Sequence, residues 1–489
     1  MSMSLQRHRL ASVDDDARYF WQASWANAPT QPERRGPYLR PRAGSCLQGR
    51  NAVPTTAIND TVDPAARRRA VIASTLGNAF EWFDFTIYGL FAVVIAKQFF
   101  PASSETNSLL LSVATLGISF FVRPIGGVLF GLYADRVGRK SALSLMVLLM
   151  ALGTGMIGLT PSYASVGIAA PLLIVLARII QGFSVGGEFG SATALLIEYA
   201  PPGKRGFYGS FQMCAQALSV FLGGLASYVL NTSLSRADLE SWGWRIPFLL
   251  GILIGPIGFY IRRRIEESPE FAAYRRTATQ GGIWPLKEVF ARHGRELFAG
   301  FGLTVAGTVS FYVTLIYIPI HAVKQLHLAQ SMASLSTLLS ALLLLFLCPL
   351  SGYLSDQFGR KPLIVTGIAL YGVTSYALFL QLQHQPSDAH LLMAQLLPSL
   401  CMGMVWGGYP ATVTETIPVG MRSTGVSILY NFAVMLFGGL AALTITWLIK
   451  VTGNPLVPAY YILFGVTFSL LSYGIWGRNP PPARLAVAV

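Results

Sequence analysis

Apolar stretches long enough to cross a lipid bilayer occupy most of this chain. A transmembrane helix needs about 20 mostly apolar residues, and the 489-residue sequence offers twelve such segments in two sets of six. Hydrophobic residues make up 53% of the chain and charged residues 12%, about half the charge of an ordinary soluble domain. The sequence therefore predicts an all-α integral membrane protein. Its spans are expected at about 71–97, 108–134, 141–160, 168–199, 207–230 and 245–262, and then at about 297–323, 330–354, 362–382, 390–415, 422–447 and 457–476.

The positive charge of the chain is concentrated in the loops between these segments. The net charge is +14. The loops assigned to one side of the membrane hold sixteen Lys and Arg, and those assigned to the other side hold five. The positive-inside rule makes the richer side cytoplasmic and places both termini there. Because this rule accounts for the charge, no nucleic-acid partner is expected.

One connection, at 262–296, is much longer than the others and separates the two sets of spans. The predicted parts are a flexible cytoplasmic N-terminal tail at 1–66, an N-terminal six-helix bundle at 67–264, a cytoplasmic inter-bundle loop at 265–296, a C-terminal six-helix bundle at 297–478 and a cytoplasmic tail at 479–489.

Two pairs of loop sequences indicate that the second set of spans duplicates the first. GLYADRVGRK at 131–140 matches GYLSDQFGRK at 352–361, an offset of 221 residues. EYAPPGKRG after the fourth span matches ETIPVGMRSTG after the tenth, an offset of 217 residues. Halves related by an axis along the membrane normal are a transporter architecture.

The duplicated loops also predict a conformational latch. An Asp at a helix end can accept hydrogen bonds from the N-terminus of another helix or pair with an Arg, and Gly138 permits a tight turn. Such contacts could hold the two halves together in one state and break in the other. A solvated basic loop is the alternative for a single copy, and the duplication argues against it. The expected latch residues are Asp135, Arg139, Glu198 and Arg205 in the first half and Asp356, Arg360, Glu415 and Arg422 in the second.

These motifs, with their surroundings, resemble the major facilitator superfamily. The similarity is greatest to its metabolite:proton symporter branch, which contains citrate, α-ketoglutarate, shikimate and proline/betaine carriers. The resemblance rests on GNAFEWFDFTIYG (77–89), FFVRPIGGVLFGLYADRVGRK (120–140), ARIIQGFSVGGEFG (177–190), KRGFYGSFQ (204–212) and SWGWRIPF (241–248). It implies two six-helix bundles in the major facilitator fold, a central site between them and alternating access driven by protons. Tyr133 departs from the Leu that is more usual in the superfamily loop.

Ionisable residues inside a span are costly and usually functional. Glu81, Asp84 and Tyr88 share one face of the first span, and a carboxylate in this setting can bind and release a proton. Asp84 and Glu81 are therefore candidate proton-coupling residues, and Tyr88 is a candidate substrate contact. A structural ion pair, or a cap at the outer mouth, is the alternative.

Arg123 lies twelve residues before Asp135, which places it near mid-bilayer at 1.5 Å per residue. Its planar fork fits a carboxylate, so it is a candidate substrate anchor. A fixed salt bridge to Glu81 or Asp84 is the alternative, and both arrangements can occur in one cycle.

In the fourth span, Arg178 begins an Arg-x-x-Gln-Gly pattern that the resemblance links to proton transfer. It is a candidate proton relay or second anchor, with Glu188 as its possible partner. Gln212 and Gln216 in the fifth span, and Tyr312 and Asn431 in the second half, complete the candidate substrate site, although polar residues can also serve only to join helices.

The expected function is proton-coupled symport of a small organic acid, with citrate or another di- or tricarboxylate as the first choice. A proline/betaine or shikimate carrier is the alternative. The sequence contains no GxxxxGK[ST] phosphate-binding loop and no cluster with metal-ligand spacing. No catalytic residue, cofactor or metal is therefore expected. The expected partners are an organic anion, protons and the bilayer of the cytoplasmic membrane, with the chain acting as a monomer.

Overall fold

The computed structural model describes residues 63–102, 105–263, 266–277 and 286–476. Residues 52–489 form one compact unit. The expected N-terminal tail lies outside the described residues up to position 62, and so does the expected C-terminal tail at 479–489.

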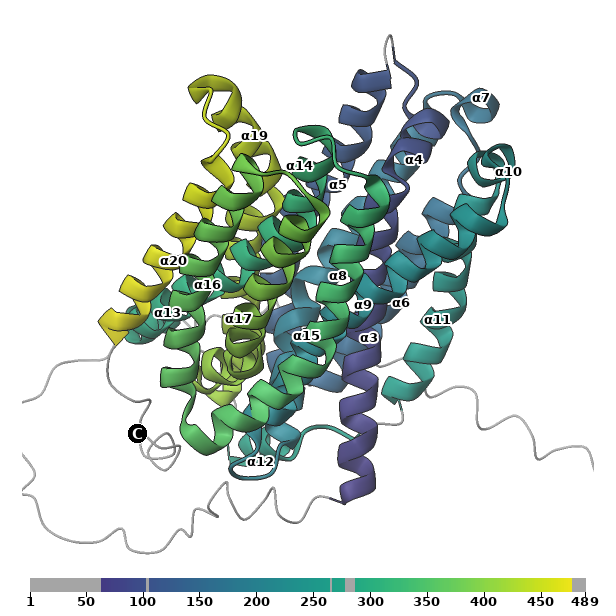
Figure 1. Ribbon diagram of the computed structural model, residues 1–489. Helices are drawn as coiled ribbons and strands as arrows, with labels where there is room; N and C mark the ends of the chain where they lie inside the picture. The colour runs from purple at the N-terminus through teal and green to yellow at the C-terminus, as the bar shows by residue number, and fades with distance from the viewer. Residues whose placement is uncertain (1–62, 103–104, 264–265, 278–285, 477–489) are drawn as a thin grey trace, which may run out of the picture. The chain divides into compact units, whose positions relative to one another are not determined.

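The first half contains six long helical regions, each close to an expected span (Figure 1). Shorter helices α7, α10 and η1 lie in the connections. The bounds are α3 Pro64–Leu90, α4 Ala92–Phe99, α5 Glu105–Val137, α6 Arg139–Leu159, α7 Tyr163–Val166, α8 Ala169–Tyr199, α9 Arg205–Ser233, α10 Arg236–Ser241, η1 Gly243–Arg245 and α11 Ile246–Arg263.

The first span differs from its expected limits at both ends. It begins at Pro64 because the Asp63 carboxylate caps the helix by accepting hydrogen bonds from the backbone N–H groups of Ala65 and Ala66. Asp as the capping residue, followed by Pro in the first turn, is a strong helix start. At its other end, α3 bends by 69° into α4.

The second half repeats this plan after the short helix α12. Two of its spans are continuous through π-helical segments, η2 and η4. The bounds are α12 Pro269–Thr277, α13 Leu286–Val309, η2 Ser310–Tyr317, α14 Ile318–Lys324, α15 Gln330–Phe358, α16 Arg360–His384, α17 Asp388–Glu415, η3 Val419–Met421, α18 Arg422–Val434, η4 Met435–Gly439, α19 Ala441–Thr452 and α20 Val457–Trp476.

Ten helical regions among the described residues are long and apolar enough to cross a membrane, or eleven if the bent pair α3 and α4 counts as one span. The 18-residue helix α11 stands at the position of the remaining expected span. The twelve-span arrangement expected from the sequence thus agrees with the helices observed.

The two bundles meet along a few helices. α9 of the first bundle packs along α15 and α17 of the second, and α18 packs against α5 and α8. Within the first bundle, α5 and α8 approach closely because glycines face each other. A Cβ atom on Gly186 would lie 2.2 Å from the carbonyl oxygen of Arg123, and one on Gly126 would lie 2.2 Å from that of Phe183. This close packing fixes the position of Arg123 in the interior.

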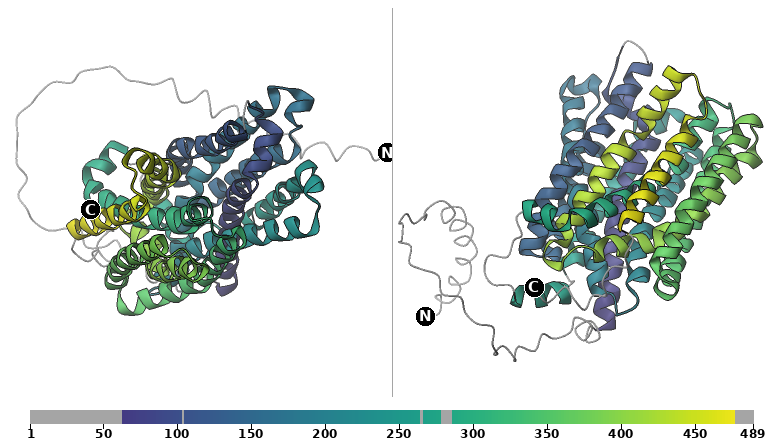
Figure 2. Two further views of the ribbon diagram at one scale, coloured as in Figure 1. Left: turned by 45° about the horizontal axis from the view of Figure 1, so that its top comes forward. Right: turned by 90° about the vertical axis from the view of Figure 1, so that its left-hand side faces the viewer.

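The helices have two distinguishable ends. We call the end that carries the duplicated loops and α12 the basic end; it lies at the bottom of Figure 1. The opposite end, at the top of Figure 1, carries α4, α7, α10, α14 and α19. Figure 2 shows the same helices from two further sides.

Candidate functional site

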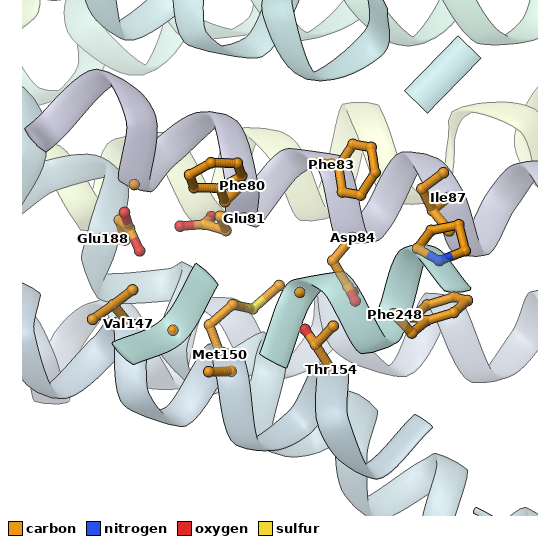
Figure 3. Close-up of a pocket in the computed structure, with 15 residues that line it drawn as sticks. Phe80, Glu81, Phe83, Asp84, Ile87, Val147, Met150, Thr154, Glu188 and Phe248 are labelled. Carbon is orange, nitrogen blue, oxygen red and sulfur yellow. The ribbon is translucent and has the colours of Figure 1, made fainter. Parts of the chain in front are cut away.

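The first span presents two faces to two separate cavities. Trp82 lines a central cavity between the bundles. Its neighbours Glu81 and Asp84 line a second cavity, whose lining residues all come from α3, α6, α8 and α11 (Figure 3). Because successive helix residues point about 100° apart, one helix can serve as the wall between the two cavities.

Asp84 and Arg178 form a buried ion pair in the first bundle. The distance from Arg178 Nη1 to Asp84 Oδ2 is 2.9 Å, and the two side chains are 0% and 3% exposed. Gln181 donates to the same carboxylate oxygen at 2.8 Å and to the Thr154 hydroxyl at 3.0 Å. Glu188 was expected as a possible partner of Arg178, and the ion pair seen in the structure joins Arg178 to Asp84.

Tyr88 packs against the guanidinium of this ion pair. Its ring lies 3.8 Å from the guanidinium carbon of Arg178, and its hydroxyl donates to the carbonyl of Ser112 at 3.3 Å. It lines neither cavity. The structure therefore places Tyr88 in the core of the first bundle, as a positioning residue for Arg178, and away from the substrate position expected for it.

Arg123 is fully buried and lies among aromatic rings. Its guanidinium carbon lies 4.5 Å from the ring centres of Phe85 and Phe120 and 5.2 Å from that of Trp82. None of its three guanidinium nitrogens forms a hydrogen bond with another described residue. The expected alternative, a salt bridge to Glu81 or Asp84, is not formed with these residues in this structure. Arg123 is thus a buried cation held by ring faces, with its donors unused.

The central cavity receives side chains from both bundles. Its described lining contains hydroxyl, amide and aromatic groups and no Asp or Glu. Gln216 donates to the Tyr430 hydroxyl at 3.1 Å across the bundle interface. The Tyr312 hydroxyl lies close to Arg123 and has no hydrogen-bond partner among the described residues. The lining residues are Trp82, Met213, Gln216, Thr304, Gly307, Thr308, Phe311, Tyr312, Tyr409, Tyr430 and Val434.

The other two candidates for this site lie beside the cavity lining. Asn431 donates at 2.6 Å to the carbonyl of Gly186, and so joins α18 to α8. Gln212 is fully buried, and its side-chain amide has no hydrogen-bond partner in the described part of the chain. Asn431 therefore connects the bundles in this state, whereas the donors of Gln212 are unused.

At the basic end, the two copies of the duplicated loop make reciprocal contacts. The Asp135 carboxylate of the first bundle accepts hydrogen bonds from the backbone N–H groups of Ser423 and Thr424, at 3.2 and 2.9 Å, where α18 begins. The Asp356 carboxylate of the second bundle accepts from Gly206 and Phe207, both at 2.8 Å, where α9 begins. Each carboxylate thus binds the positive end of a helix in the other bundle.

The turns of the two loops use glycine in the same way. Gly138 has φ = 133° and Gly359 has φ = 90°. Residues with a side chain rarely adopt these angles, so a glycine is required where α5 meets α6 and where α15 meets α16.

Ion pairs reinforce both copies. In the first, Arg139 lies 3.2 Å from both Asp135 and Glu198, and Arg422 reaches across to Glu198 at 3.1 Å. In the second, Arg360 pairs with Asp356 at 3.6 Å and also with Glu415, and Arg205 reaches across to Glu415 at 3.6 Å. These eight residues are the expected latch set, and the structure brings all of them together at the basic end.

Sequence reasoning missed the start of the inter-bundle segment. Glu270 pairs with Arg205 and, at 3.0 Å, with Arg422. The Phe271 ring lies 3.8 Å from the Arg139 guanidinium carbon. The signal was available in ESPEF at 267–271, where two carboxylates flank Ser-Pro directly after the sixth span. The region was treated only as a connecting loop.

Glu267 joins this segment to the first bundle. Its carboxylate accepts hydrogen bonds from the backbone N–H groups of Arg139 and Lys140, at 3.1 and 3.4 Å, at the start of α6. Burial raises the pKa of Glu267 above its ordinary value of 4.5, and hydrogen bonding from Ser268 and the charge of Arg139 oppose that rise. The contacts at the basic end therefore include one carboxyl group whose protonation responds to pH.

Among the described residues, no group of three or more His, Cys, Asp or Glu side chains is arranged to hold a metal ion.

Two family descriptions match successive parts of the chain. Residues 69–282 match the description "Sugar (and other) transporter", and residues 300–488 match "Major Facilitator Superfamily". The boundary between the two matches falls in the inter-bundle segment.

Similar proteins cover nearly the whole membrane region. A citrate-proton symporter of Klebsiella pneumoniae is 38% identical over 83% of this chain and 91% of its own length. A proline/betaine transporter of Salmonella typhimurium is 33% identical over 84% of this chain and 83% of its own length. A solved structure of the proton:xylose symporter XylE is similar with a TM-score of 0.70 and 21% identity, over 84% of this chain and 96% of that one.

The XylE structure supports the fold alone at that level of identity. The sequence relatives support the family, because a citrate-proton symporter and proline/betaine transporters each match this chain over more than four-fifths of their length. This chain is a member of the major facilitator superfamily, in its branch of metabolite:proton symporters.

Proposed function

We propose that this protein is a proton-coupled symporter that brings a small organic acid anion across the cytoplasmic membrane, with citrate or another di- or tricarboxylate as the leading candidate. Both termini and the basic end face the cytoplasm. The proposal rests above all on Arg123, a buried cation whose hydrogen-bond donors are unused among the described residues.

Burying a cation without an acidic partner is costly. The position of the Arg123 guanidinium inside the membrane region therefore favours a role in binding an anion. A guanidinium fork binds a carboxylate through two parallel hydrogen bonds. The Tyr312 hydroxyl nearby can donate a further hydrogen bond to the same ligand. Donors therefore outnumber acceptors around Arg123, which suits a ligand rich in carboxylate oxygens.

The aromatic groups of the site do not by themselves favour a cationic ligand. The faces of Phe85 and Phe120 are already occupied by the Arg123 guanidinium, which would repel a second cation. Phe189 and Tyr430 stack face to face with ring centres 3.4 Å apart. These ring faces are thus unavailable to a quaternary ammonium group.

A zwitterion of the proline or betaine kind is the second candidate. Trp82, Tyr409 and Tyr312 give the central cavity further aromatic walls, and aromatic walls can bind a quaternary ammonium group. The proline/betaine relatives are consistent with this possibility. A zwitterion would also use Arg123, through its single carboxylate.

We propose that Asp84 couples proton entry to this binding. Protonation of Asp84 would break its ion pair with Arg178 and leave that guanidinium free for another partner. The latch at the basic end would close the cytoplasmic side while the site is loaded from outside, and its opening would release the substrate inside.

The test is an uptake screen in proteoliposomes with an imposed pH gradient. Radiolabelled citrate, α-ketoglutarate, shikimate, proline and betaine would be compared. The proposal predicts accumulation of citrate or another di- or tricarboxylate, abolished by a protonophore. Accumulation of proline or betaine without any polycarboxylate would replace the leading candidate with the second one.

A further inference from the structure

Three carboxyl groups line the cavity inside the first bundle. Asp84 is paired with Arg178, and Glu81 and Glu188, which line the same cavity, are 2% and 1% exposed. Their side chains come from α3 and α8 and point toward one another (Figure 3). We infer that Glu81 and Glu188 share one proton in this cavity, at a site distinct from the Asp84–Arg178 pair. The inference rests on the proposed function only in the second of the two experiments below, which measures transport.

The charges around the cavity support a shared proton. The charged groups that line it are Glu81 and Asp84 on α3 and Glu188 on α8, and Arg178 on α8 borders it through its ion pair with Asp84. The lining residues of α6 and α11 carry no ionisable group. Two ionised glutamates whose side chains point toward one another would repel each other in the interior. One proton between them lets one carboxyl group donate a hydrogen bond to the other and removes one negative charge.

Unused polar atoms show that the cavity has capacity for a further small polar species. The Oδ1 atom of Asp84 is buried and accepts no hydrogen bond from a described residue, although Asp84 lines the cavity. The Nη2 atom of Arg178, the ion-pair partner of Asp84, likewise donates none within the described part of the chain. Water or hydronium entering the cavity would meet the Asp84 acceptor at its wall.

This site would receive its proton without using the substrate's path. The cavity has no lining residue from the second bundle, whereas the central cavity is lined by both. Arg123 on α5 lies on the side of α3 where Trp82 faces the central cavity. The helix α3 therefore separates the two cavities. Binding of a proton to the glutamate pair would change the charge on one face of α3. The opposite face of α3 forms part of the wall of the central cavity.

The first arm of the test needs no substrate. Infrared difference spectra of the full-length protein in liposomes would be recorded between neutral and alkaline pH, at the carbonyl stretch of protonated carboxylic acids. The wild type and Asp84→Asn are expected to show a titrating carboxyl band that Glu81→Gln/Glu188→Gln lacks. Glu240→Gln, at the opposite end of the molecule, is the matched control and is expected to keep the band. An unchanged band in the double variant would disprove the shared-proton site whatever the substrate is.

The second arm measures protons moved per substrate, once a transported substrate is known. The double variant is expected to move one proton fewer per substrate than the wild type, and to lose at least about tenfold in accumulation driven by the pH gradient. Substrate exchange without a gradient is expected to stay within about threefold of wild type. An unchanged number of protons moved per substrate would show that the glutamate pair takes no part in coupling. Failure to find any substrate would count against the proposed function and leave the infrared result to decide the site.

Discussion

The two bundles share one helical plan and carry very different charges inside the membrane. The first bundle buries Glu81, Asp84, Arg123, Arg178 and Glu188, each 3% exposed or less. The apolar cores of the six spans in the second bundle contain no Asp, Glu, Lys or Arg; these cores are residues 297–323, 330–355, 362–387, 389–414, 423–449 and 457–476. Both copies nevertheless keep the latch at the basic end. Duplication has thus preserved the contacts that close the molecule, while the Asp, Glu and Arg side chains inside the spans lie in the first half.

This difference suggests a division of labour. Charged groups in the first bundle would bind the anion and the proton, and hydroxyl and aromatic groups in the second would shape the cavity. Replacements in the first bundle should then abolish transport or uncouple it, whereas replacements in the second should alter affinity.

The largest effect is expected from Arg123→Gln. Loss of the cation that is held beside Trp82 of the central cavity should reduce uptake and exchange of the transported anion by about a hundredfold or more, which corresponds to about 2.7 kcal/mol. Arg123→Lys keeps the charge but not the planar fork, so partial activity is expected. Both would be measured as initial uptake rates, with size-exclusion profiles as the control for folding. Normal affinity of Arg123→Gln for the transported anion would show that Arg123 is not the substrate anchor.

The latch should be stronger in its first copy than in its second. Arg422 is 6% exposed and pairs with Glu198 and Glu270, whose side chains are 0% and 2% exposed. Arg205 is 16% exposed and pairs with the buried Glu270 and with Glu415, which is 19% exposed and also keeps Arg360. Losing one partner of a buried network costs about 1–3 kcal/mol, and less where water has access.

Hydrogen exchange of backbone amides can measure this asymmetry, because Asp135 and Asp356 accept hydrogen bonds from the first amides of α18 and α9. Arg422→Gln should speed exchange at Ser423 and Thr424 by about tenfold or more, through easier local opening. Arg205→Gln should speed exchange at Gly206 and Phe207 by about threefold. Equal effects of the two substitutions would show that burial does not set the strength of the latch.

A smaller effect is expected from Tyr312→Phe in the second bundle. Removing one hydroxyl that can donate to the substrate should cost about 0.5–1.5 kcal/mol, or roughly a threefold to tenfold rise in KM. The number of protons moved per substrate should not change. A change in that number would place a coupling group in the second bundle and break the comparison.

The smallest effect concerns pH at the basic end. Burial raises the pKa of Glu267 in the closed arrangement, so the closed arrangement favours its protonated form. The contribution of Glu267 to closure is therefore full below its ordinary value of 4.5 and is lost as pH rises through the raised value. In Glu267→Gln, exchange at the first amides of α6 should lose this dependence on pH. Glu240→Gln, at the other end, should keep it.

Much of the fold could be predicted because each span leaves a long apolar signal. Each boundary lies within a few residues of its expected place except at the starts of the first and seventh spans, because the Asp63 cap extends the first helix and α13 begins at Leu286. The bend after Leu90 also divides the first span. A bend depends on packing against neighbours, which hydropathy does not report. The latch residues could be predicted because their motifs occur in both halves of the sequence.

The partners of buried charges could not be predicted in the same way. Glu188 lies ten residues after Arg178 on the same helix, about 15 Å along it. The pairing of Arg178 with Asp84 depends instead on how α3 packs against α8. Tyr88 shares a helical face with Asp84, yet its ring packs against the Arg178 guanidinium in the core of the bundle. Glu267 and Glu270 were missed because they occur once, in a segment that has no counterpart in the second half.

The central claim is that anion binding and proton coupling are separate tasks of different charged groups in the first bundle. The most direct measurement compares Arg123→Gln with Asp84→Asn for gradient-driven uptake and for exchange without a gradient, in one proteoliposome preparation. The account predicts that Arg123→Gln loses both activities, whereas Asp84→Asn loses driven accumulation and retains exchange. Loss of both activities to the same degree in both variants, with intact folding, would contradict it.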